Sequence, residues 1–538
     1  MYRQSDKEVN VAINIPRVPG FDNSARTVTL VKISICLAIA SGIACWAIGA
    51  WVIAEGASHV LLMFEAGELT REAILFVISG IITVTNDALG YVHTVALRWA
   101  LYREGRLEYN TNPRFFTSAR TSFANRWYMN ILSAAMLVLS YTCVSVLLIR
   151  SLGKLRDVSE DERTEEDGDD GVYGFGTGLS ALPLALLGFS LFVQVLTAIL
   201  CLRQHDTQLP TWTASPLANT LAALHGHSGL RRRPNRCMMP ASEAKADSQP
   251  RKPVRRQPYL WSLRYVKWIV LFLWTLCIMA WAWTAAMIRL TITLPRIRKD
   301  SFSFQWTPLD EVLLDQSTTI QLSFFTTRNN SFKPGMGIFL AILFLWLVQG
   351  IQALGLHCLE LLVNMSRDEN AWQQAGRYKG VLIGSPPLIA ALTSWRMVSL
   401  TLLKTVIHWL LGQSFVPFAQ MVPGQMSNGD IGTTEFFVFR ISPSRVLVFA
   451  ILSSVAAMYG TFLAFWRVKS PQPAAWGHVQ TLADLIDDWR TIDGKIWWGD
   501  KGSNEVSGYR HAGTSYSREK VGKLDMAALY AEQDACIS

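Results

Sequence analysis

Three long apolar stretches of this sequence carry polar side chains of types that transfer protons, hold ions or pair with one another. These side chains are Asn86, Asp87, His93, His357, Glu360, Arg396, Lys404 and His408. A charge at the centre of a bilayer costs about 2.5–3.5 kcal/mol on insertion scales, so charged groups in apolar segments usually face a partner or a water-filled space. We therefore expect these residues to form a polar intramembrane cluster.

Depth along each stretch predicts the partners within this cluster. Asp87 lies past the middle of its stretch, and Lys404 lies a little past the middle of a stretch expected to run the opposite way. The two side chains should therefore lie at similar heights and pair. Glu360 and Arg396 both lie near the cytosolic ends of their stretches and are expected to form a second pair.

Three interpretations of the cluster remain open: a structural network that fixes helix pairing, a path for ions, protons or a small solute, and a metal site. The metal site would use His357, Glu360, His93 and His408. His357 and Glu360 are three residues apart and share one face of a helix, as metal ligands require, but this spacing is also common by chance. No G-x-S-x-G, H-E-x-x-H or Walker A motif is present, so no catalytic residue, metal ligand or cofactor is assigned.

The composition indicates which elements must position these residues. Half of the 538 residues are hydrophobic and only 17% are charged, whereas soluble domains carry roughly 25% charged residues. Apolar stretches long enough to cross a bilayer, which needs about 20 residues, lie at 28–54, 73–97, 127–149, 179–202, 266–290, 338–363, 388–412 and 444–466. We expect an all-α, polytopic membrane helix bundle with about eight transmembrane helices and short cytosolic helices.

Basic residues in the connecting segments predict the orientation. With a cytosolic N-terminus, the inner segments hold 33 Lys and Arg, the outer loops 11 and the spans six, which together make the 50 in the chain. This bias follows the positive-inside rule and places both termini in the cytosol. The sequon at Asn329 would then lie outside and be open to glycosylation, whereas the one at Asn364 would not.

The predicted organisation alternates soluble segments with groups of spans. The segments are a cytosolic N-terminal segment (1–27), spans one to four (28–202), a cytosolic loop (203–265), spans five to eight (266–466) and a cytosolic tail (467–538). The membrane is expected to be the plasma membrane rather than the endoplasmic reticulum. The net charge of +9 is explained by the inner loops, so nucleic-acid binding is not expected.

The connecting segments differ in character. Ser215 and Pro216 predict the start of a short helix over 216–225, and the basic stretch 228–258 is expected to be disordered beside the inner leaflet. That position suits either binding of anionic lipids or a simple topology signal. The acidic run 157–170 lacks the spacing of a calcium loop and indicates a solvated loop. Residues 319–325 and 436–441 are β-prone and could form a strand pair.

The tail carries an amphipathic helix signal. Apolar residues recur at helical spacing over 476–490, and Asp484, Asp487 and Asp488 supply an acidic side. We expect this helix, with Trp497 and Trp498, to pack against 98–126 and 210–225. The acidic side would face the arginines of the first of these segments, and order should end near residue 502.

Several stretches resemble an uncharacterised family of multi-spanning membrane proteins from filamentous fungi. They are LGYVHTVALRWALYREGRLEYN (89–110), PTWTASPLANTLAAL (210–224), WGHVQTLADLIDDW (476–489), WWGDKG (497–502) and RHAGTS (510–515). The resemblance implies a fungal membrane protein and brings with it no activity, ligand or catalytic residue.

We expect a non-enzymatic membrane protein whose partner is the lipid bilayer. A transport or channel-like role ranks first, a scaffold or signalling role second and an intramembrane metalloenzyme third. Water access to Asp87 and Lys404 would favour transport, a dry and fully paired cluster would favour a scaffold, and converging imidazole and carboxylate groups would favour the enzyme. The sequence predicts neither a substrate nor an oligomeric state.

Overall fold

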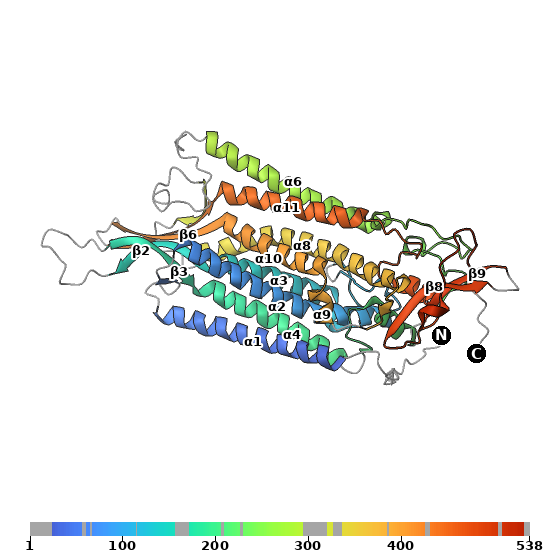
Figure 1. Ribbon diagram of the computed structural model, residues 1–538. Coiled ribbons are helices and arrows are strands. Elements are labelled where there is room, and N and C mark those ends of the chain that lie inside the picture. Colours follow the sequence, from blue (N-terminus) through green and yellow to red (C-terminus); the bar gives the residue numbers. More distant parts are fainter. Residues whose placement is uncertain are drawn as a thin grey trace, which may run out of the picture.

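Long parallel and antiparallel helices dominate the structure. The computed structural model describes residues 24–55, 61–64, 67–113, 116–156, 172–205, 209–225, 230–293, 320–326, 336–384, 387–425, 431–503 and 508–531. Its long helices are α1 (Ser24–Glu55), α2 (Glu68–Arg103), α3 (Trp127–Ser145), α4 (Ala181–His205), α6 (Arg264–Thr293), α8 (Met336–Gln373), α10 (Trp395–Ser414) and α11 (Pro443–Phe465). They lie side by side and run between two ends, each of which carries a small β-sheet (Figure 1).

Seven of these helices are long and apolar enough to cross a membrane, among the residues that the structure describes. They are α1, α2, α3, α4, α6, α8 and α11. Large apolar side chains such as Leu37, Trp51, Ile278 and Phe462 are exposed on their outer faces, as expected of helices that face lipid. The remaining long helix, α10, packs against α2, α3, α8 and α11.

One end of the bundle carries a six-stranded sheet, which we call the six-stranded end. Its strands, in spatial order, are β1 (Leu61–Phe64), β3 (Val172–Ser180), β2 (Leu148–Arg156), β6 (Phe415–Gln425), β7 (Ile431–Ile441) and β4 (Ile320–Thr326). The hairpins β2–β3 and β6–β7 are antiparallel, and β2 joins β6 in parallel, with Arg150 opposite Phe418. The predicted pair of β-prone segments is confirmed, since β4 pairs with β7 and Ile320 lies opposite Ile441.

The other end, which we call the three-stranded end, is built from the segments that connect helices and from the tail. It contains α5 (Pro216–His225), α9 (Pro387–Leu392), α12 (Val479–Leu485) and the strands β5 (Val381–Leu382), β8 (Lys495–Ser503) and β9 (Arg510–Ser515), in the sheet order β5-β8-β9. The predicted helix over 216–225 is confirmed as α5. Its first free N–H groups are capped by Ser215, whose Oγ accepts from the Ala218 N–H at 3.5 Å.

The sheets and the ordered loops differ from the sequence expectations. The chain is mostly helical, but it is not all-α. Residues 230–258, expected to be disordered, are packed: Cys237, Met238 and Met239 are buried, and the Arg251 N–H donates to the Tyr530 carbonyl at 3.0 Å. Pro, Ser and Arg lower the local apolar content of this segment, but the bundle and the tail supply the core that the segment lacks by itself.

The tail also differs in its secondary structure and in its extent. It packs against the predicted partners, because the Asn110 N–H donates to the Gly477 carbonyl at 2.8 Å and α12 contacts α5. The helix, however, covers only Val479–Leu485, and Trp497 and Trp498 lie in strand β8. The described order continues to residue 531 rather than ending near 502. The acidic run 157–170 and the sequon at Asn329 lie outside the described residues.

Candidate functional site

A buried lysine joins three helices near the middle of the bundle. Lys404 of α10 places its Nζ 3.0 Å from Asp87 Oδ1 of α2 and 2.8 Å from Glu360 Oε2 of α8. His357 Nδ1, one turn earlier on α8, lies 2.9 Å from the same Glu360 oxygen. The predicted pair of Asp87 and Lys404 is therefore confirmed, and the four side chains form one connected group, the Lys404 cluster.

The cation and the carboxylates of this cluster differ in exposure. The Lys404 side chain is 3% exposed, whereas the side chains of Asp87 and Glu360 are 30% and 28% exposed. The ammonium group is thus enclosed by its partners, while both acids keep an open edge. In each acid one carboxylate oxygen contacts Lys404, and the other oxygen can accept a hydrogen bond from a further group.

The other predicted members of the polar intramembrane cluster have contacts of their own. His408 stacks on Tyr141 of α3, with ring centroids 3.8 Å apart, and Asn86 donates to Ser140 Oγ at 2.9 Å. Arg396 does not pair with Glu360 as predicted; its Nη1 donates to the Ser366 carbonyl at 3.0 Å. Glu360 is drawn instead to Lys404, which lies deeper along α10. His93 is buried on α2.

A second group of charges, which the sequence analysis missed, lies at the six-stranded end. We call it the Glu68 cluster. Glu68 of α2 is 2.7 Å from Arg71, 3.2 Å from Arg150 of β2 and 3.3 Å from Arg445 of α11. Arg445 is also paired with Glu72. Arg71 and Arg445 are completely buried, so this cluster ties α2, the sheet and α11 together at the point where the helices begin.

Polar acceptors complete the Glu68 cluster. Arg71 donates to Gln413 Oε1 at 3.1 Å and to the Leu148 carbonyl at 3.4 Å, and Arg445 donates to the Gln413 carbonyl at 3.1 Å. A buried guanidinium group is tolerated only when its donors are satisfied. The signal in the sequence is the pair of acids, Glu68 and Glu72, around Arg71 within one helical turn, just before the predicted span 73–97.

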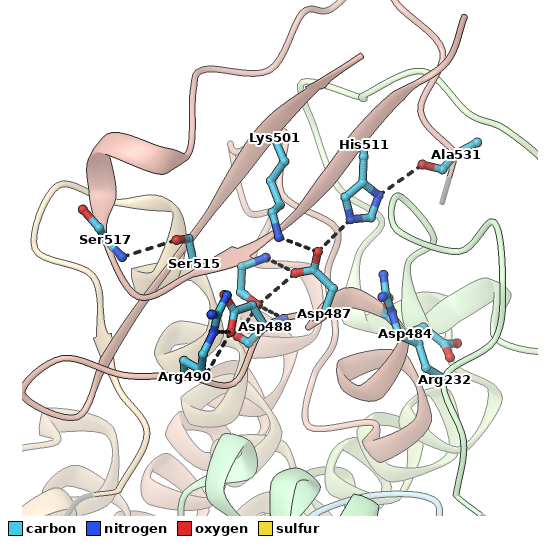
Figure 2. A network of polar contacts seen from close by, with 11 residues as sticks. Arg232, Asp484, Asp487, Asp488, Arg490, Lys501, His511, Ser515, Ser517 and Ala531 are labelled. Carbon is cyan, nitrogen blue, oxygen red and sulfur yellow. Dashed lines mark hydrogen bonds and ion pairs between the residues drawn. The ribbon is translucent and has the colours of Figure 1, made fainter. Parts of the chain in front are cut away.

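The tail forms a third polar group around Asp487 at the three-stranded end (Figure 2). Asp487 accepts from His511 Nε2 and from Lys501 Nζ, each at 2.8 Å, and from the Thr514 N–H at 2.6 Å. His511 Nδ1 lies 3.2 Å from the Ala531 carbonyl. Both ring nitrogens of His511 therefore face oxygen acceptors, which is the arrangement of an imidazolium.

The electrostatics of this group agree with its geometry. Burial would lower the pKa of His511, but the hydrogen bond to Asp487 outweighs it and raises the pKa to about 9. Burial likewise opposes ionisation of Asp487, yet the hydrogen bonds from His511 and Lys501 hold its pKa well below its usual range. His511 and Asp487 are thus a charged pair at neutral pH.

The acidic side of the tail does not face the arginines of 98–126 as expected. Asp484 pairs with Arg233 at 2.7 Å, and Asp488 pairs with Arg490 at 2.8 Å. The segment that reaches 98–126 is instead the start of α12, where the Val479 N–H donates to the Glu108 carbonyl at 3.0 Å. The three aspartates organise the tail and the basic loop rather than dock the tail on the bundle.

The stretches that carry the family resemblance contact one another at the three-stranded end. Trp99 Nε1 donates to the Thr211 carbonyl at 3.0 Å and Arg98 Nη1 to the Thr213 carbonyl at 3.2 Å, which joins 89–110 to 210–224. Asp487 joins 476–489 to 510–515 through His511. These contacts join segments that lie far apart in the sequence into one packed end.

The described residues contain no group of three or more His, Cys, Asp or Glu side chains that could hold a metal ion. His408, one of the predicted ligands, stacks on Tyr141. Among the described side chains, the arrangement shows charge pairing between Lys404, Asp87 and Glu360. The chain matches no protein-family model, no curated protein and no solved structure.

Proposed function

We propose that the chain crosses the membrane eight times and that its three-stranded end lies in the cytosol. The eighth span is α10, whose 20 residues reach about 30 Å at 1.5 Å per residue. It runs between the same two ends as its neighbours (Figure 1), and its lysine is neutralised by two acids. The excess of Lys and Arg in segments at the three-stranded end supports this orientation.

We further propose a transport or channel-like role in which protons or a small polar solute pass along the Lys404 cluster. The observation that carries this proposal is the contrast in exposure between Lys404 and its two acids. An ionised carboxylate that faced lipid would be costly, so the open edges of Asp87 and Glu360 call for water or a polar solute. A purely structural pair would be expected to enclose both partners.

The connectivity of the cluster supports a coupling between charge and helix packing. Glu360 is shared by His357 and Lys404, while Lys404 is shared by α2 and α8. If Glu360 takes up a proton, the attraction between α8 and α10 weakens and Lys404 is left with Asp87 alone. A single proton transfer would therefore change the ion pairs that join α10 to α2 and α8.

Proton flux into proteoliposomes tests this role. The purified protein is reconstituted with the pH-sensitive dye pyranine inside, and a potassium gradient with valinomycin sets the membrane potential. We expect flux above that of protein-free liposomes, and we expect Glu360→Gln and Lys404→Gln to reduce it to the background. Thr94→Val on α2 is the matched control, because the Thr94 hydroxyl donates only to the Gly90 carbonyl of its own helix.

A scaffold or signalling role is the second candidate, and the three-stranded end favours it. Five segments far apart in the sequence build one packed unit there, with a core that includes Leu217, Trp372, Leu482 and Trp498. Such a unit presents a defined surface beside the membrane. Wild-type flux equal to that of empty liposomes, together with unchanged stability of Glu360→Gln, would favour this role over transport.

A further inference from the structure

A further buried arginine, Arg440, lies near Arg150 in the sheet of the six-stranded end. Arg150 of β2 lies opposite Phe418 of β6, and Arg440 of β7 lies opposite Val416 of β6. Because Val416 and Phe418 are two residues apart on β6, the side chains of Arg150, Phe418 and Arg440 share one face of the sheet. The guanidinium carbon of Arg440 lies 4.0 Å from the centre of the Phe418 ring. Phe418 is therefore covered by one arginine and flanked by another.

Arg440 lacks the partners that the other buried arginines have. Its side chain is buried, with 4% of the residue exposed, yet its Nε and Nη1 groups make no hydrogen bond. Arg71, Arg150 and Arg445 are all paired with glutamates of the Glu68 cluster. A cation–π contact satisfies the charge of a guanidinium group only in part and satisfies none of its N–H donors.

The charges of the surrounding side chains also favour a bound anion. Among the described side chains of this region, three arginines pair with the two glutamates Glu68 and Glu72, and Arg440 adds a fourth cation, which leaves an excess of positive charge. Burial lowers the pKa of Arg440 to about 10, which still leaves the group charged at neutral pH. A buried cation with unused donors is unfavourable unless an anion supplies the missing acceptors.

We propose that Arg440, beside Phe418 and Arg150, binds an oxyanion at the six-stranded end of the bundle. The planar fork of a guanidinium group fits two oxygens of a phosphate or a carboxylate. The shared chemistry is that of a phosphate oxyanion, which either a dissolved phosphate or the headgroup of an anionic lipid provides. This site is separate from the Lys404 cluster, so the proposal stands independently of the transport role.

Thermal unfolding followed by tryptophan fluorescence tests the proposal on the full chain in a neutral detergent. Inorganic phosphate is titrated against chloride at equal ionic strength, and phosphatidylglycerol is titrated against phosphatidylcholine in mixed micelles. We expect a saturable rise of the wild-type Tm, on the order of 1–3 °C, with one of the two probes. A response to inorganic phosphate indicates a dissolved ligand, and a response to phosphatidylglycerol alone indicates a lipid headgroup.

Arg440→Gln separates an anion ligand from a structural residue. Without anion, this variant should unfold at the wild-type Tm or above it, because an unpaired buried charge has been removed, and it should lose the response to the probe. Arg440→Lys, which keeps the charge, should respond at a higher probe concentration. Arg289→Gln, exposed at the end of α6, is the matched control and should respond like the wild type. No rise with either probe, or a full response of Arg440→Gln, would overturn the proposal.

Discussion

The Lys404 cluster and the Glu68 cluster use the same interaction in opposite ways. In the Lys404 cluster a single enclosed cation meets two acids that keep about 30% and 28% of their side chains exposed. In the Glu68 cluster the arginines Arg71 and Arg445 and the acid Glu72 are almost completely buried. Because removing one partner of a buried ion pair leaves an uncompensated charge, we expect the Glu68 cluster to contribute more to the stability of the fold than the Lys404 cluster, whose acids are partly exposed.

The largest expected effect is the loss of one partner in the Glu68 cluster. Arg445→Gln should lower the free energy of unfolding by about 3–5 kcal/mol, because it leaves Glu72 buried without its cation. Unfolding in mixed micelles containing a denaturing detergent, followed by tryptophan fluorescence, measures this loss.

The double variant Glu72→Leu with Arg445→Met should recover most of that stability, since an apolar pair removes the desolvation cost of both charges. Arg289→Gln, exposed near the same end, serves as the reference and should change stability little. A loss below about 1 kcal/mol for Arg445→Gln would remove the distinction between the two clusters.

The pair of Asp487 and His511 extends the comparison to a charge pair outside the spans. The pKa of His511 is raised from 6.5 to about 9, so its stabilisation is fully present below pH 6.5 and is lost as the pH rises through 9. Loss of the interaction should cost on the order of 3 kcal/mol locally.

Hydrogen exchange of peptides covering 484–503 and 508–531, measured from pH 6.5 to 9.5 and corrected for the intrinsic rate, reports this loss. His511→Gln should remove the pH dependence while leaving peptides of the helices unchanged. Protection that is independent of pH in the wild type would show that the pair does not hold the tail.

A smaller effect is expected for the Lys404 cluster. Lys404→Met should cost about 1–2 kcal/mol, less than Arg445→Gln, because Asp87 and Glu360 are partly exposed and their charges are less costly to leave without a cation. The same unfolding measurement applies, and Lys404→Met with Asp87→Asn and Glu360→Gln should be closer to the wild type. If Lys404→Met is as destabilising as Arg445→Gln, then the acids are enclosed and the comparison fails.

The smallest expected effect is a mobility shift that reports which side of the membrane each cluster faces. With the six-stranded end outside the cytosol, Asn329 should carry a glycan in a eukaryotic host, seen as a mobility shift that an endoglycosidase removes. Asn329→Gln should abolish the shift, whereas Ser366→Ala, at the other sequon, should not alter it. A glycan on Asn364 would place the Glu68 cluster in the cytosol and reverse the proposed orientation.

The sequence predicted the elements of the bundle better than it predicted their rotation. Apolar runs gave the long helices, and depth along them gave the pair of Asp87 and Lys404, which lie 3.0 Å apart. Depth does not give the direction in which a side chain points around the helix axis. For this reason Glu360 was assigned to Arg396, which lies at a similar height, although it pairs with Lys404.

The strands of the six-stranded end were harder to predict. Phe436–Ile441 reads as a strand because aromatic and β-branched residues dominate it, and it does pair with β4. By contrast, β6 contains Pro417 and Pro423, which argue against a strand, and the start of β2 had been read as the end of a span. The Glu68 cluster could not be predicted from the sequence, because only the folded sheet brings Arg150 of β2 to Glu68.

The parallel pairing of β2 with β6 has a consequence for the order in which the chain assembles during synthesis. Each hairpin, β2–β3 and β6–β7, has partners close in sequence and can form as soon as its own residues emerge. The junction between them joins Arg150 to Phe418 and must wait until α10 and β6 have been made. Until then β2 keeps an unpaired edge, so a ribosome-bound chain stopped before β6 is the form most exposed to edge-to-edge aggregation.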